Sequence, residues 1–172
     1  MDLKIEQLQY DDAEKLLAFE LENRDFFEEM VPSRGDEYYK VDIFNKQLQN
    51  LLDEQVEGLS YYHLIKSKEG TILGRINLVD IDHSQQLGHV GYRVGKAYTG
   101  SGIASEALRL LIESMSKQGI RKLLAKTTTN NIASQKILTR NGFEQVTTDT
   151  EEFEMNGQTV KFIYFRKSIV TI

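Results

Sequence analysis

The sequence predicts a mixed α/β domain in which helices flank a central, twisted and mostly antiparallel sheet. Apolar residues recur with a helical period up to about residue 52 and with a period of two from residue 59 to residue 94. An amphipathic stretch, residues 103–115, lies between two strand-like segments. The dipeptide Asn156-Gly157 is typical of a type I′ hairpin. Because no Gly/Ser/Pro-rich linker divides the chain, we expect a single domain over residues 1–172.

The composition narrows the classes of function. The chain has 172 residues with 21 basic and 26 acidic side chains, a formal net charge of -5 that disfavours binding to nucleic acid. Such acidity favours a cationic partner, for example an amine. The absence of cysteine excludes disulfides, thiolate metal sites and an acyl-cysteine intermediate, and it fits a reducing cytoplasm. Neither a secretory signal nor a long apolar run is present, so no membrane association is expected.

After a first strand, the N-terminal region is expected to be helical. Residues 11–22 and 41–52 each carry apolar side chains on one helical face. The polar connection between them, residues 23–39, contains four aromatic residues: Phe26, Phe27, Tyr38 and Tyr39. Two interpretations stay open, because these aromatics either cap the core or form a wall of a substrate cleft.

Three strands are expected next. Residues 61–70 and 71–82 alternate apolar and polar side chains and meet at Lys68-Glu69-Gly70, which predicts a hairpin. After a polar break at residues 82–86, the segment HVGYRV, residues 89–94, predicts the third strand.

The second half is expected to alternate helices and strands. The helix at residues 103–115 ends before Gly119, which suits a C′ position. Residues 121–129 predict a strand, residues 131–140 a helix closed by Gly142, and two final strands flank Asn156-Gly157. The unit from Gly88 to Thr128 predicts a right-handed strand-helix-strand crossover inside a mixed sheet.

The segment YTGSGIASEAL, residues 98–108, places two glycines around Ser101 between a strand and a helix. The first N–H groups of a helix lack partners, and the helix dipole favours an anion there. Gly100 and Gly102 are therefore expected to let a phosphate approach the backbone closely. Helix caps also use glycine and serine, so this turn alone leaves a purely structural role open.

Two familiar nucleotide-binding motifs do not match this turn. A Walker motif needs serine or threonine after its Gly-Lys pair, whereas Gly95-Lys96 is followed by Ala97. The dinucleotide fingerprint needs glycine or alanine where this chain has Ser105. A phosphate-binding enzyme that uses another nucleotide stays as a distant alternative.

The segments GSGIASEALRLLI and NNIASQKILTRNGFE together resemble the paired acyl-coenzyme A motifs of the GCN5-related N-acetyltransferase (GNAT) superfamily. Within it, HVGYRV, NIASQKIL and NGFE are most similar to the RimJ/RimL group of ribosomal-protein alanine N-acetyltransferases. The detailed match covers Gly88 to Glu144, and the element order of the rest agrees. The resemblance implies the GNAT fold, acetyl coenzyme A as cosubstrate, no metal, and transfer of an acetyl group to a primary amine.

The resemblance also implies which residues bind the cosubstrate. The family's Arg/Gln-Gly-x-Gly-x-Gly/Ala loop, whose backbone binds the pyrophosphate, falls on Thr99, Gly100, Ser101, Gly102, Ile103 and Ala104. Thr99 departs from arginine or glutamine, which leaves the side-chain contact of that position open. The pantetheine arm is expected beside the main chain of Tyr92, Arg93 and Val94. In the second motif, Asn131 and Ser134 match positions that face the cofactor.

An amine attacks a thioester only as the free base, so a residue or a water molecule must take its proton. His89 is the candidate base, because relatives of this group often carry glutamate there and an imidazole accepts a proton near neutral pH. The alternative is a strand histidine that only forms hydrogen bonds or faces solvent. Asp80 and Asp82 are further candidates, or else solvated loop acids. A backbone N–H near Val94 is the expected donor to the oxyanion.

The leaving thiolate also needs a proton. Many relatives place a tyrosine four residues before the glycine of the Gly-Phe pair, where this chain has Leu138. Ser134 is the candidate donor, directly or through water, and cofactor contact or helix packing is the alternative. Because cysteine is absent, direct transfer in a ternary complex is the simplest mechanism.

The sequence does not select the acceptor amine. The resemblance implies a protein N-terminal amine, for instance of a ribosomal protein, but the same scaffold serves small amines such as polyamines and aminoglycosides. The aromatic segment from Phe26 to Tyr39 is expected to select the acceptor. A noncatalytic acyl-coenzyme A sensor is the rival function, and both a monomer and a homodimer stay open.

Overall fold

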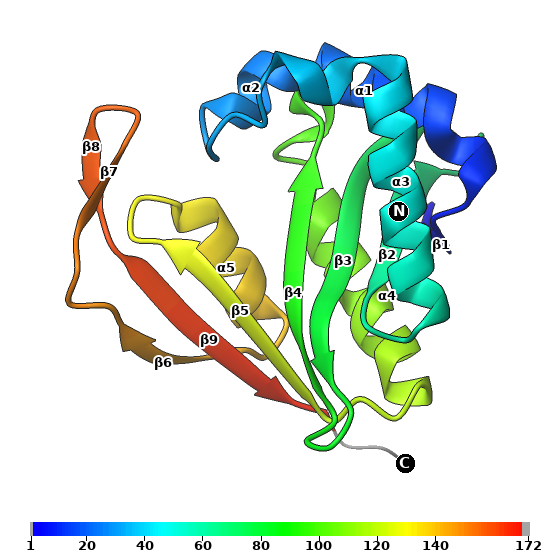
Figure 1. The fold of residues 1–172 in the computed structure, drawn as a ribbon. Helices are drawn as coiled ribbons and strands as arrows, with labels where there is room; N and C mark the ends of the chain where they lie inside the picture. The colour runs from blue at the N-terminus through cyan, green and yellow to red at the C-terminus, as the bar shows by residue number, and fades with distance from the viewer. Residues whose placement is uncertain (1, 170–172) are drawn as a thin grey trace.

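The computed structural model describes residues 2–169 and contains a seven-stranded sheet with the order β1-β2-β3-β4-β5-β9-β6 (Figure 1). Its strands are Leu3–Gln7 (β1), Tyr61–Ser67 (β2), Ile72–Asp82 (β3), Leu87–Val94 (β4), Lys122–Thr128 (β5), Glu144–Thr148 (β6) and Phe162–Ser168 (β9). All neighbouring strands are antiparallel except β4 and β5, which are parallel. The predicted mixed, mostly antiparallel sheet with flanking helices is confirmed.

Helices cover both faces of the sheet. They are Ala13–Glu22 (α1), Arg24–Glu28 (α2), Val41–Val56 (α3), Ile103–Lys117 (α4) and Ile132–Arg140 (α5), with short 3-10 helices at Tyr10–Asp12 (η1), Asp36–Tyr39 (η2) and Lys96–Tyr98 (η3). Within residues 2–169, no helix has both the length and the apolar character needed to cross a membrane.

Two buried clusters lie on opposite faces of the sheet. Side chains of α1, α2 and α3 form one with alternate residues of β2, such as Tyr62 and Leu64. Side chains of α4 and α5 form the other with Ile65, Ile76 and further residues of β3, β5 and β9. This division follows from the period of two in a strand, which sends successive side chains to opposite faces.

The sheet opens between β4 and β5. Their residue partners run only from Leu87↔Lys122 to His89↔Leu124. Beyond this point β4 stays paired with β3 as far as Val94, whereas β5 stays paired with β9, and the two strands diverge (Figure 1). After His89, the backbone of β4 therefore has no strand partner on the β5 side within the described chain.

Glycine-dependent turns end the elements where the sequence predicts. Gly119 and Gly142 follow α4 and α5 with a φ of 84° each, in the left-handed region that favours glycine. Asn156 and Gly157 have φ values of 51° and 78°, the two positive values that a type I′ turn requires. These predictions are confirmed.

Two regions differ from the expected element order. The connection at residues 23–39 contains α2 and η2, which are too short to produce a clear apolar period. The strands that flank Asn156-Gly157 are Phe153–Met155 (β7) and Gln158–Val160 (β8), a separate two-stranded hairpin, whereas β6 and β9 belong to the main sheet. Two strands do flank Asn156-Gly157, as predicted, but the number of strands in this region was wrong because β6 and β9 are present as well. All five residues of β6 are exposed, so they give no alternation of apolar and polar side chains.

Candidate active site

The turn between β4 and α4 is bonded to β3 and to Asn23, the C-cap of α1. The Gly95 N–H donates to the Leu73 carbonyl at 2.8 Å, and the Lys96 N–H donates to Asn23 Oδ1 at 2.8 Å. A Cβ added at Gly95 would lie 3.0 Å from the Phe19 ring. Because α1 lies so close to this turn, it fixes the position of Gly95 and Lys96, at which the glycine-containing loop to α4 begins.

The loop itself presents backbone donors. Gly100 and Gly102 have φ values of 77° and 81°, and Gly102 is the N-cap of the 15-residue helix α4, which begins with Ile103 and Ala104. The Ser101 hydroxyl donates to the Tyr98 carbonyl at 2.7 Å and the Thr99 hydroxyl to the Lys96 carbonyl at 2.9 Å.

The side-chain hydroxyls of this loop therefore bind the loop's own carbonyls and leave its amides free. Within residues 2–169, the N–H groups of residues 100–102 have no protein acceptor. A Cβ added at Gly100 would meet no atom within 4 Å. An open, amide-rich helix start fits a pyrophosphate.

The second half of the site faces β4 from α5. The Asn131 side chain caps this helix by accepting the Ser134 N–H at 3.1 Å, which holds Ser134 in the first turn. The Tyr92 and Ser134 hydroxyls lie 3.0 Å apart. The structure thus brings together two residues that the sequence placed in separate motifs.

Burial raises the pKa of Tyr92, and the Ser134 hydroxyl acts weakly in the opposite direction. The phenol therefore carries its proton at neutral pH. From the sequence, only the main chain of Tyr92 was expected to take part in the site, and a role for its hydroxyl was not predicted. Leu138, at the position of the tyrosine in many relatives, is 1% exposed and lies in the core.

His89 lies at the last residue pair of the parallel β4–β5 ladder and is exposed. Within the described chain no hydrogen bond or ion pair to its side chain is found. By strand alternation His89 shares a face of β4 with Gly91 and Arg93, while Tyr92 and Val94 occupy the opposite face. The candidate base and the Tyr92 hydroxyl therefore lie on opposite sides of the strand.

Of the two other candidate bases, Asp80 is an exposed residue of β3 with a φ of 50°, and Asp82 is bonded within its own turn. The remaining histidines also have structural surroundings. Burial lowers the pKa of His63 to about 4, and the Nε2 atom of His83 lies 2.6 Å from the Gly58 carbonyl. Asp82 accepts hydrogen bonds from the Ser84 side chain and from backbone N–H groups of its own turn, and the Ser84 hydroxyl lowers the pKa of Asp82. These contacts favour a structural role for Asp82 in the β3–β4 turn.

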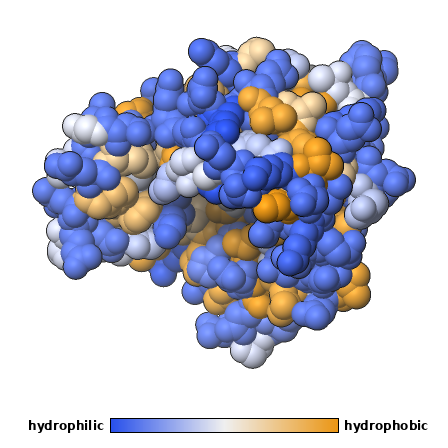
Figure 2. All heavy atoms as spheres, turned by 45° about the horizontal axis from the view of Figure 1, so that its top comes forward, coloured by the Kyte–Doolittle hydropathy of each residue, from blue (hydrophilic) through white to orange (hydrophobic). Residues whose placement is uncertain are grey.

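A cavity of about 190 Å³ lies on the His89 face of the sheet, under α1 and α3. We call it the arginine cavity, because Arg34, Arg75 and Arg93 all line it. The rest of its lining is aromatic, aliphatic or uncharged polar, including Tyr38, and the lining contains no carboxylate. Figure 2, in which the top of Figure 1 comes forward, shows a hollow near the middle of the molecule with hydrophobic residues inside it and hydrophilic ones around it.

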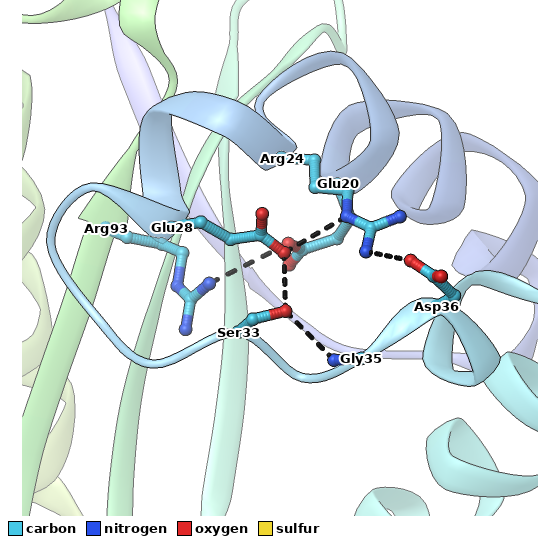
Figure 3. A network of polar contacts seen from close by, with 7 residues as sticks. All are labelled: Glu20, Arg24, Glu28, Ser33, Gly35, Asp36 and Arg93. Carbon is cyan, nitrogen blue, oxygen red and sulfur yellow. Dashed lines mark hydrogen bonds and ion pairs between the residues drawn. The ribbon is translucent and has the colours of Figure 1, made fainter.

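One buried carboxylate lies beside two of these arginines. Glu20, which is 1% exposed, accepts a hydrogen bond of 2.6 Å from Arg75 and lies 3.8 Å from Arg93 (Figure 3). Arg75 and Arg93 are direct partners across β3 and β4, so Glu20 offsets the repulsion between two like charges. Burial lowers the pKa of Arg93, and the nearby charge of Arg34 lowers it further.

The segment after α2 is held over this cavity by polar contacts. Arg24 pairs with Glu28 at 3.1 Å and with Asp36 at 2.6 Å, and Ser33 donates to Glu28 at 2.8 Å (Figure 3). The open question about the aromatics is partly resolved: Phe27 is buried in the core, whereas Tyr38 lines the cavity.

A strand-turn-helix with free amides, next to two strands that part, defines the architecture of an acyl-coenzyme A-dependent N-acetyltransferase. The family model described as "Acetyltransferase (GNAT) domain" matches residues 2–144. The chain belongs to this GNAT family, and acetyl coenzyme A is its acyl donor.

Two curated relatives and one solved structure agree with this assignment. The probable N-acetyltransferase YjcK of Bacillus subtilis (strain 168) is 29% identical over 157 residues, 89% of this chain and 86% of the relative. The [ribosomal protein uS5]-alanine N-acetyltransferase of Escherichia coli (strain K12) is 28% identical over 137 residues, 78% of this chain and 71% of the relative. The structure of RimL, a ribosomal L7/L12 α-N-protein acetyltransferase in complex with coenzyme A, has a TM-score of 0.88 at 19% identity and covers 98% of this chain and 95% of that chain.

Proposed function

We propose that this N-acetyltransferase acetylates the α-amine of a protein N-terminus, with His89 as general base and the Tyr92–Ser134 pair as proton donor. The observation that carries the proposal is the arrangement around β4. A candidate base and a cavity lie on one face, and a protonated hydroxyl pair lies on the other. A curated relative that acts on the alanine of ribosomal protein uS5 supports this class of acceptor.

The loop and the end of β4 are proposed to hold the acyl donor. The backbone of Gly100 to Ala104 would bind the pyrophosphate, with Thr99 contributing only its main chain because its hydroxyl is already bonded to Lys96. The main chain of Tyr92, Arg93 and Val94 would bind the pantetheine arm, since β4 has no strand partner there on the β5 side. Asn131 would act through Ser134, whose position it fixes.

The chemistry follows from the two faces of β4. The acceptor amine approaches on the His89 face, His89 takes its proton, and the nitrogen lone pair forms a bond to the thioester carbonyl carbon. The backbone N–H near Val94 donates to the oxygen as negative charge develops on it. When the carbon–sulfur bond breaks, the sulfur takes a proton from Ser134, which is replenished from Tyr92. Solvent then carries the proton held by His89 back to Tyr92, so the enzyme is restored. Acetylated amine and free coenzyme A result, with no covalent enzyme intermediate.

The experiment measures thiol release from acetyl coenzyme A with N-terminal peptides, polyamines and aminoglycosides as acceptors, while calorimetry measures coenzyme A binding to the same protein. Turnover confined to peptides with a free α-amine supports the proposal, and N-terminally blocked copies of the same peptides are the control. Turnover with polyamines or aminoglycosides alone would overturn it. Tight coenzyme A binding without turnover on any amine would favour the sensor. The lack of cysteine is consistent with a cytoplasmic site of action, which we also propose.

A further inference from the structure

In and around the arginine cavity, positively charged side chains outnumber negatively charged ones. Three guanidinium groups, those of Arg34, Arg75 and Arg93, line it, and one buried carboxylate, that of Glu20, faces two of them. The whole chain, in contrast, carries a net charge of -5. A positive pocket in an acidic protein is not explained by the general surface charge.

Each of these arginines is held in place by the fold. Arg75 is 7% exposed and bonded to Glu20, and the Arg93 guanidinium lies 5.0 Å from the centre of the Phe27 ring. Arg34 donates to the Tyr38 hydroxyl at 2.5 Å and lies over the Tyr38 ring at 4.7 Å. Planar guanidinium groups fixed in this way are suited to binding a carboxylate, because little side-chain entropy is lost when the ligand arrives.

The cavity is also close to the reacting atoms of the proposed function. Arg93 directly precedes Val94, and successive residues of a strand are only about 3.4 Å apart. At about 190 Å³ the cavity is smaller than pockets that enclose a whole drug-sized ligand, which begin at about 300 Å³. It therefore has room for one small group of an acceptor, attached within a residue or two of the attacking nitrogen.

We infer that the arginine cavity binds a carboxylate of the acceptor, so the enzyme selects an amine that carries an acidic group in its first or second residue. This inference rests on the proposed function, because it assumes that the acceptor enters on the His89 face. The carboxylate comes either from an acidic side chain of a peptide or from the α-carboxylate of a free amino acid. A polyamine, which carries only positive charge, is repelled by the same site.

The test uses four-residue peptide amides with a free α-amine. Aspartate or its neutral isostere asparagine occupies position one or two, and alanine occupies the other positions. Free aspartate and spermidine complete the panel. Binding is measured by calorimetry on the protein loaded with coenzyme A, and kcat/KM is measured by thiol release. Direct binding reports on the cavity even if none of these amines is acetylated.

We expect an aspartate peptide to bind about tenfold more tightly than its asparagine partner, as a charge-assisted hydrogen bond in a partly buried site implies. A preference for free aspartate over the peptides would identify an amino acid as the source of the carboxylate. Equal binding of aspartate and asparagine peptides, or tighter binding of spermidine, would overturn the inference. If aspartate peptides bind preferentially but no peptide is acetylated, the proposed function fails and the carboxylate site stands.

The Arg34→Gln variant removes charge without exposing a buried partner, because Arg34 is on the surface and donates to a neutral hydroxyl. It is expected to reduce the preference for aspartate to about threefold or less, and Arg34→Lys to restore part of it. Arg109→Gln is the matched control, since Arg109 is an exposed arginine paired with Glu106 on α4 and does not line the cavity. An unchanged preference in Arg34→Gln would also overturn the inference.

Discussion

The hydroxyl groups of Tyr92 and Ser134 lie 3.0 Å apart, so a hydrogen bond joins β4 to α5 beyond the point where β4 and β5 separate. The motif that resembles the family has Leu138 where many relatives carry a tyrosine, four residues before Gly142. A different tyrosine, Tyr92 of β4, has its pKa raised by burial and contacts α5 at Ser134, one helical turn before Leu138.

Tyr92→Phe and Ser134→Ala are each expected to lower kcat about 100-fold, the usual size of a general-acid contribution. Because the two hydroxyls form one donor unit, the double variant should lose little more than either single variant. Thiol release measures kcat, and calorimetry checks that coenzyme A still binds. Tyr164→Phe, which removes a surface hydroxyl bonded to Asp149, is the control. Additive losses would mean that the two hydroxyls act separately.

His89→Gln is expected to lower kcat more than it changes the KM for acetyl coenzyme A. A general base works only when it is unprotonated, so the proposed role makes part of the rate loss at acidic pH depend on the side chain at position 89. That part should disappear in the variant, whereas the part caused by protonation of the acceptor amine should stay. His83→Gln removes a histidine bonded to the Gly58 carbonyl and should leave the profile intact. An acidic limb in His89→Gln identical to that of the unmodified enzyme would assign His89 a structural role.

The sequence predicted the elements whose signals are local. The turn at Gly100 and Gly102, where both glycines have positive φ, and the helix that begins after Asn131 each depend on a few neighbouring residues. The type I′ turn at Asn156-Gly157 was predictable for the same reason. Local signals of this kind do not depend on how the rest of the chain packs.

The sequence missed what depends on distant packing. Glu20 and Arg75 are 55 positions apart, and in the sequence each is an ordinary charged residue of a helix or a strand. The aromatic segment was expected to select the acceptor, but the three arginines around Tyr38 were not predicted. They come from a loop and two strands that are far apart in the sequence. A local hint was Arg75 between the apolar residues Leu73 and Ile76, where a buried charge needs a partner. Register between β3 and β4, which no local pattern reveals, makes Arg93 its neighbour.

Gly100→Ala is expected to weaken coenzyme A binding about tenfold or more. The new methyl group meets no protein atom within 4 Å but occupies the space through which a phosphate reaches the loop amides. Gly70→Ala is the matched control, because Gly70 also has a positive φ, 91°, and equally open surroundings in the β2–β3 turn. Both variants should lose a similar, small amount of stability. Equal coenzyme A affinity in the two variants would show that the loop does not bind the cosubstrate.

Glu20→Gln is expected to destabilise the fold by about 3 kcal/mol or more, because it leaves two neighbouring arginines without their buried counter-charge. Urea unfolding followed by circular dichroism measures the loss. Arg109→Gln, which breaks only exposed pairs on α4, should cost far less stability. A loss in Glu20→Gln no larger than that of the surface variant would mean that Arg75 and Arg93 do not depend on Glu20.

The stability of the protein is expected to fall as the pH drops from about 6.5 to 4, because of His63 on β2. This side chain is 8% exposed, and burial lowers its pKa to about 4, while an unfolded histidine titrates near 6.5. Between these values the unfolded chain binds a proton that the folded chain does not, so the free energy of unfolding decreases with falling pH. The difference amounts to about 3 kcal/mol over the whole interval.

Replacing His63 with leucine, an apolar side chain of similar size, removes this proton uptake. Urea unfolding at pH 7, 6, 5 and 4.5 should then show a shallower pH dependence for His63→Leu than for the unmodified protein, whatever the difference in stability at pH 7. His83→Gln should keep the original slope, because that histidine is exposed. If His63→Leu and the unmodified protein lose stability in parallel between pH 6.5 and 4.5, the burial of a neutral imidazole at position 63 is not the source of the acid sensitivity.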